Sequence, residues 1–89
     1  MKIYNNKINE EFVDKLKLEF EKLIGNSFRI SSDNSKILKE VIIFKRNTVN
    51  FYFGFETKPR FIHKILLDDI LPLNPEIREL IKKVQFPNG

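Results

Sequence analysis

Residues 41–56 decide the fold, and they read VIIFKRNTVNFYFGFE. From Val49 to Phe55 large apolar residues occupy every second position, which is the period of a strand with one buried face. The preceding run, 41–44, is rich in β-branched and aromatic side chains, and the pair Asn47-Thr48 separates the two runs. The stretch therefore predicts a β-hairpin.

The length of the turn determines which side chains share a face of this hairpin. With Asn47 and Thr48 as a two-residue turn, residue 44 faces residue 51. The core face then consists of Ile42, Phe44, Val49, Phe51, Phe53 and Phe55. The outer face receives Val41, Ile43, Lys45, Asn50, Tyr52 and Gly54. A shift of one residue in the turn would change these assignments. Phenylalanines turned to solvent, as on RNA-binding sheets, would require burial of Glu56, so we expect them inside.

An amphipathic helix is predicted upstream of the hairpin, from Asn9 to Gly25. Its apolar residues recur every three or four positions along one face: Phe12, Val13, Leu16, Phe20, Leu23 and Ile24. Asparagine is a good N-cap, and glycine readily adopts the left-handed conformation that ends a helix. Between this helix and the hairpin, residues 27–31 alternate as a strand, and residues 32–35 read as a polar loop.

The C-terminal third predicts further helices. Residues 61–71 have helical spacing, and Pro72 would end that helix. Residues 61–67 also fit a buried strand, but we prefer the helix. Residues 74–76 read Asn-Pro-Glu, which predicts the start of a last helix, because asparagine caps, proline suits the first turn and glutamate favours the helix dipole. Residues 86–89 form a short tail. The prediction is a single α+β domain, 1–89, in the order α-β-β-β-α-α, with helices on one face of two or three antiparallel strands.

Composition excludes several classes of chemistry. The chain has no cysteine, so it forms no disulfide, thiolate metal site or iron–sulfur cluster. Its one histidine, His63, has neither Asp68 nor Asp69 at helical spacing, and we interpret it as a surface residue rather than a general base. The three glycines form no phosphate-binding loop. We therefore expect no catalytic residues, no cofactor and no metal. The absence of a long apolar run predicts a cytoplasmic protein with no membrane partner.

Positive charge is concentrated in the middle of the chain. Residues 36–66 carry seven basic and two acidic side chains, a net +5, whereas the whole chain carries +4. A hairpin brings the residues before Glu40 near those after Phe55, so we expect five cations at its open end: Lys36, Lys39, Lys58, Arg60 and Lys64. This cluster predicts an anion or nucleic-acid site. Five contacts to duplex DNA would give log affinity against log salt a slope of about −4.5. A lysine-rich surface produced by codon bias is the alternative.

The outer face of the hairpin predicts a second kind of contact. An apolar patch with an aromatic centre and a polar rim is typical of protein interfaces, and here it consists of Val41, Ile43, Lys45, Asn50 and Tyr52. The partner would be another protein or a second copy of the chain, unless the segment Lys2-Ile3-Tyr4 covers the patch. We therefore predict a non-enzymatic, accessory or inhibitory protein that occludes a surface of a larger partner. Twelve isoleucines, twelve lysines and no alanine suit an AT-rich, viral or mobile-element gene. Nucleic-acid binding through the basic cluster is the alternative function.

Overall fold

The computed structural model describes residues 2–3, 10–58 and 60–86. Its elements, in chain order, are β1 Lys2–Ile3, α1 Glu10–Glu21, β2 Ser27–Ser31, β3 Asn34–Lys45, β4 Val49–Lys58, β5 Phe61–Leu66, α2 Leu67–Ile70, the 3-10 turn η1 Leu71–Leu73, and α3 Pro75–Gln85. The sheet is antiparallel, with β4 between β3 on one side and β1 and β5 on the other, and with β2 beyond β3. The α+β class is confirmed. The four longer strands and β1 exceed the two or three predicted.

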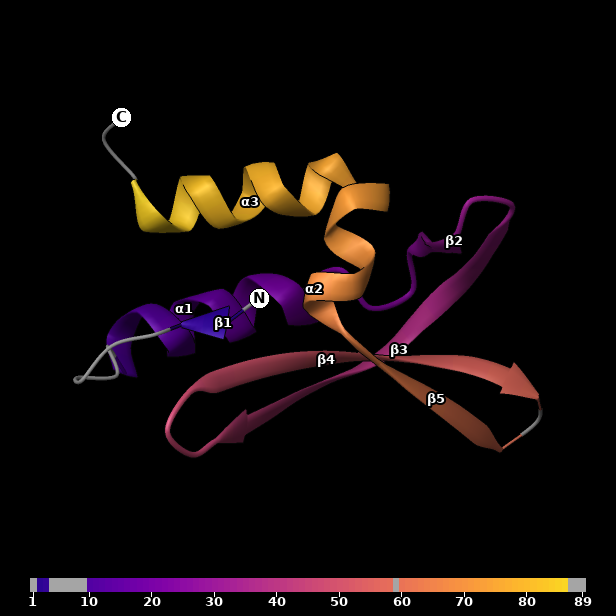
Figure 1. Cartoon of the computed structure of the whole chain (residues 1–89), viewed down its shortest axis with the longest axis horizontal. Helices are drawn as coiled ribbons and strands as arrows, with labels where there is room; N and C mark the ends of the chain where they lie inside the picture. Colours follow the sequence, from indigo (N-terminus) through magenta and orange to yellow (C-terminus); the bar gives the residue numbers. More distant parts are fainter. Residues whose placement is uncertain (1, 4–9, 59, 87–89) are drawn as a thin grey trace.

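All three helices lie on one side of the sheet (Figure 1). Helix α1 packs on β3, α2 packs on β4 and β5, and α3 packs on α1. The alternating phenylalanines of β4 face these helices, and Phe51, Phe53 and Phe55 are fully buried, as predicted. Phe20 of α1 meets Phe51 and Phe53 edge-on, with ring centroids 5.2 Å apart in both pairs. The core therefore forms between β4 and the helices.

The register of the β3–β4 hairpin differs from the predicted one by one residue. Lys45 lies opposite Val49, Ile43 opposite Phe51 and Val41 opposite Phe53. Residues 46–48 make the turn, and the Arg46 amide donates a hydrogen bond of 3.0 Å to the Thr48 carbonyl. Because directly opposed residues share a face, Val41, Ile43 and Lys45 lie on the core side. Their predicted outer position is wrong.

Ile42 and Phe44 take the outer positions instead, so their predicted place in the core is also wrong. Ile42 lies opposite Tyr52, and Phe44 lies opposite Asn50. Phe44 remains 53% exposed, which a core residue would not be. The alternation of β4 was sufficient to orient β4, but the run 41–44 is apolar at every position, so only the turn could orient β3.

Helix α1 begins close to the predicted start but ends at Glu21, so Leu23 and Ile24 of the predicted stripe lie beyond it, and Ile24 is exposed. Val13, Leu16 and Phe20 are buried, and Gly25, with φ of +99°, adopts the left-handed conformation expected after a helix. The predicted cap, Asn9, lies outside the described residues. The predicted strand 27–31 is β2, whereas only residues 32–33 of the predicted loop are a turn, since β3 already begins at Asn34.

Residues 61–66 form strand β5, not the preferred helix, and the alternative of a strand is confirmed there. Apolar spacing could not separate the two, but β4 has a free side on which β5 pairs, with Leu66 opposite Tyr52 and His63 opposite Phe55. The chain then turns helical at Leu67, and α2 ends at Ile70, before Pro72 as predicted. The order is therefore β-α-β-β-β-β-α-α rather than α-β-β-β-α-α.

Asn74 precedes α3, yet its side chain makes no capping hydrogen bond. It is 98% buried and bridges two layers instead. Its Oδ1 accepts from the Arg29 amide at 3.0 Å, and its Nδ2 donates to the carbonyls of Arg29 and Ile70 at 2.8 and 2.9 Å. These bonds fix the end of α2 and the start of α3 to strand β2.

Candidate interaction surface

The face of the sheet opposite the helices is the first candidate site, and we call it the open face. Strand register assigns to it every second residue of β3, β4 and β5. Its apolar members are Ile42, Phe44, Tyr52, Ile62 and Leu66. Its polar and charged members include Glu40, Asn50, Glu56 and Lys64. No described helix covers this face (Figure 1).

An aromatic pair lies on the open face. The rings of Phe44 and Tyr52 are 5.2 Å apart and nearly perpendicular, at 89°. Edge-to-face contacts of this kind add about 0.5–1.5 kcal/mol to simple burial and hold both rings in place. Four residues of this face are half-buried: Ile42, Tyr52, Ile62 and Leu66. The aromatic pair and these partly buried aliphatic side chains therefore give the open face an apolar region.

The centre of the open face is crowded at Gly54. A Cβ atom there would lie 2.6 Å from Cγ of Glu40 and 2.7 Å from Cγ2 of Ile62. The side chains of β3 and β5 thus approach each other across the glycine of β4. Nearby, Asn50 donates from Nδ2 to Oγ1 of Thr48 at 3.2 Å, while its buried Oδ1 has no hydrogen-bond partner among the described residues.

The five residues predicted to bind a partner lie on different faces. Asn50 and Tyr52 are on the open face, whereas Val41 and Ile43 pack against the core. Lys45 is on the core side and forms an ion pair with Glu10 of α1, with Nζ 3.0 Å from Oε2. Sequence reasoning missed Ile42, Phe44, Ile62 and Leu66, because the first two depend on the turn and the last two on β5. The segment Lys2–Ile3 adds to the edge of the sheet beside Asn50 and Val49, and Tyr4 lies outside the described residues.

The five predicted cations belong to two hairpins. Lys36 lies opposite Phe28 of β2, and Lys39 lies at the irregularity between Leu38 and Glu40. Lys58, Arg60 and Lys64 belong to the β4–β5 hairpin, where Arg60 has a positive φ of 67° in the turn. The tips of these hairpins diverge in Figure 1. Two of the five cations therefore lie on β3 and three on the β4–β5 hairpin, and their joint anion site stays a prediction.

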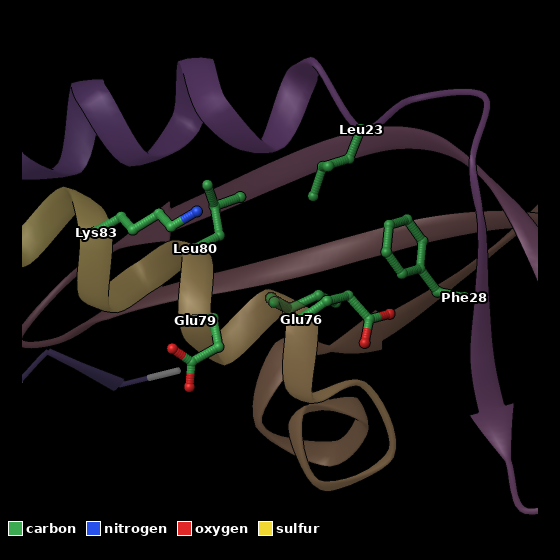
Figure 2. A pocket seen from close by; sticks show the side chains of 7 residues that line it. Leu23, Phe28, Glu76, Glu79, Leu80 and Lys83 are labelled. Carbon is green, nitrogen blue, oxygen red and sulfur yellow. The ribbon is translucent and has the colours of Figure 1, made fainter.

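A shallow groove of about 380 Å³ lies between the end of α1, strand β2 and helix α3. Figure 2 shows Leu23 and Phe28 lining it on one side and Leu80 on the other. Glu76, Glu79 and Lys83 also line it, so its charged members have both signs. A second groove, between α1 and α3, shares Leu80 and Lys83 and is also of mixed charge. Because acidic and basic side chains line both grooves, neither groove favours an anionic or a cationic ligand.

Groups suited to catalysis are dispersed. His63 is exposed on β5, opposite Phe55, and Asp69 is exposed on α2. Within residues 2–3, 10–58 and 60–86, no group of three or more histidine, aspartate or glutamate side chains is placed to hold a metal ion. None of the helices described there has the length and apolar character needed to cross a bilayer.

No protein-family model, curated protein or solved structure matches this chain significantly.

Proposed function

We propose that this protein is a non-enzymatic binding module that occludes an apolar surface of a larger protein through its open face. The observation that carries the proposal is the edge-to-face pair of Phe44 and Tyr52, which lies on a sheet face that no described helix covers and leaves Phe44 53% exposed. Aromatic side chains surrounded by partly buried aliphatic ones are typical of interface hot spots, because partner atoms complete their removal from water.

The charges of the open face favour a protein partner over nucleic acid. Glu40 and Glu56 accompany Arg46 and Lys64, so these charges balance and leave no excess of positive charge with which to neutralise phosphates. Stacking on Phe44 or Tyr52 would therefore lack the electrostatic contribution that single-stranded nucleic acids require. A desolvated apolar contact needs no such excess, and it persists at high salt.

The test compares matched variants of exposed apolar residues. The immobilised chain is incubated with cell lysate at high salt. The retained proteins are compared for wild type, Phe44→Ser and Leu18→Ser. Leu18 is 60% exposed on α1, away from the open face, and serves as the control. We expect one specific protein to be retained by wild type and Leu18→Ser and lost with Phe44→Ser, with circular dichroism unchanged. Equal retention by all three contradicts the proposal.

Nucleic-acid binding is the second candidate function, and exposure of Arg60 and Lys64 on the β4–β5 hairpin favours it. If three cations of this hairpin contact duplex DNA, log affinity against log salt should have a slope of about −2.7. Anisotropy titrations with a labelled oligonucleotide measure the slope. Loss of binding in Arg60→Ala with Lys64→Ala, but not in Phe44→Ser, would favour this function over the first.

A further inference from the structure

Strand β3 has an unpaired edge along its second half. Strand β2 pairs with β3 only as far as Ile37, and the Leu38 backbone bonds to Gly25 and Asn26 at 2.9 Å each. From Lys39 to Lys45, β3 pairs with β4 on one side and with no described strand on the other. An unpaired edge of this kind is a template for another strand.

The backbone groups on this edge belong to the odd-numbered residues. In an antiparallel pair, successive residues direct their N–H and C=O groups to opposite sides. The Arg46 amide bonds to the Thr48 carbonyl across the hairpin, so the even-numbered residues Ile42 and Phe44 also point to β4. The amides and carbonyls of Val41, Ile43 and Lys45 therefore point outward, where a second strand would bond to them.

We propose that two copies of this chain pair through these edges as an antiparallel, two-fold symmetric dimer centred on Ile43. In this register Glu40 of each copy lies opposite Arg46 of the other, because both residues are three positions from the centre. Phe44 lies opposite Ile42 of the second copy, so the two open faces join into one apolar surface. The two-fold axis uses both edges, and assembly stops at two chains.

Neighbouring registers are less favourable. If the pair were centred on Ile42, Lys39 of each copy would lie opposite Lys45 of the other. Like charges directly opposite each other destabilise a sheet. Centring it on Val41 would put Lys45 opposite Ile37, whose edge β2 already occupies. Of these three registers, the one centred on Ile43 pairs opposite charges and avoids the part of β3 that β2 occupies.

The edge of β5, along which no described strand pairs, does not match itself in this way. It carries Arg60, His63 and Lys64, and no carboxylate lies between residues 60 and 66. Two copies paired there would bring only cations together. The charge pattern therefore selects β3 as the self-pairing edge.

Sedimentation equilibrium of the purified chain over a dilution series tests the dimer without any other protein, so its outcome is separate from that of the proposed function. We expect a mass of twice 10.6 kDa at high concentration. Hydrogen exchange locates the contact: on concentration, the amides of Val41, Ile43 and Lys45 should gain protection, whereas those of Ile42 and Phe44, already directed to β4, should not. A monomer at every concentration, or protection elsewhere, overturns the proposal.

Charge exchange tests the register. Arg46→Glu places a carboxylate opposite Glu40 of the other copy at both symmetry-related positions of the dimer. We expect the dissociation constant of the dimer to rise by about tenfold. Adding Glu40→Lys to that variant should restore the wild-type value. Arg78→Glu makes the same charge change on an exposed position of α3 and should have no effect. A dimer that Arg46→Glu leaves unchanged, or a rise without rescue in the double variant, refutes pairing about Ile43.

Discussion

The covered and open faces of the sheet contain similar aromatic residues in different surroundings. On the covered face Phe53 is enclosed by Phe20, Phe28 and Phe55 and is fully buried. On the open face Phe44 contacts Tyr52 and stays half-exposed. The free energy gained by burial scales with the apolar area removed from water. The covered face therefore stabilises the fold, whereas the apolar area still exposed on the open face can be buried by a partner. Four sets of substitutions, in order of decreasing effect, test this difference.

The largest effect is expected at Phe53. Phe53→Ala removes a ring from a closed core and should lower the free energy of unfolding by about 3–5 kcal/mol. Phe44→Ala on the open face should lower it by about 1 kcal/mol, because the lost ring was partly hydrated. Urea denaturation followed by circular dichroism measures both. If Phe53→Ala leaves too little folded protein, Phe53→Leu gives the same comparison with a smaller loss. Equal losses at the two positions would mean that the open face is also core.

Asn74 joins the helices on the covered side to β2. Asn74→Ala should lower the free energy of unfolding by about 2–3 kcal/mol. The substitution leaves the Arg29 amide and the carbonyls of Arg29 and Ile70 without their side-chain partner. Asn34→Ala, at an exposed asparagine, is the control and should be nearly neutral. A small cost at Asn74 would show that water replaces its three bonds.

On the open face, Gly54→Ala should lower the free energy of unfolding by about 1–3 kcal/mol, because the added methyl group overpacks the site. The new methyl group would overlap Glu40 and Ile62, whose side chains approach each other there. Ile62→Ala in the same background should recover part of the loss in urea denaturation. Stabilisation by Gly54→Ala would show that both side chains move aside freely.

The smallest effect has the opposite sign. Asn50→Val removes a buried oxygen that has no partner within the described part of the chain and introduces a β-branched residue on the central strand. We expect the free energy of unfolding to rise by about 1 kcal/mol, even though the bond to Thr48 is lost. A decrease in the same denaturation experiment would show that Asn50 is satisfied in solution.

Much of the fold could be predicted because the relevant signals are local. Alternation along β4, the three-to-four spacing of α1 and the Asn-Pro-Glu start of α3 each reflect burial of one face of one element. The candidate site was harder to predict. Its residues Ile42 and Phe44 depend on whether two or three residues make the turn, and Ile62 and Leu66 depend on whether the chain after Arg60 pairs with β4.

Side-chain type and periodicity were enough to predict the α+β class and the inward phenylalanines of β4, and the lack of cysteine excludes thiol chemistry. Strand pairing was needed to establish which face Val41, Ile43 and Phe44 occupy and that residues 61–66 join the sheet. These features depend on pairing between distant strands. A uniformly apolar run such as 41–44 is compatible with either face, and only its neighbours select one.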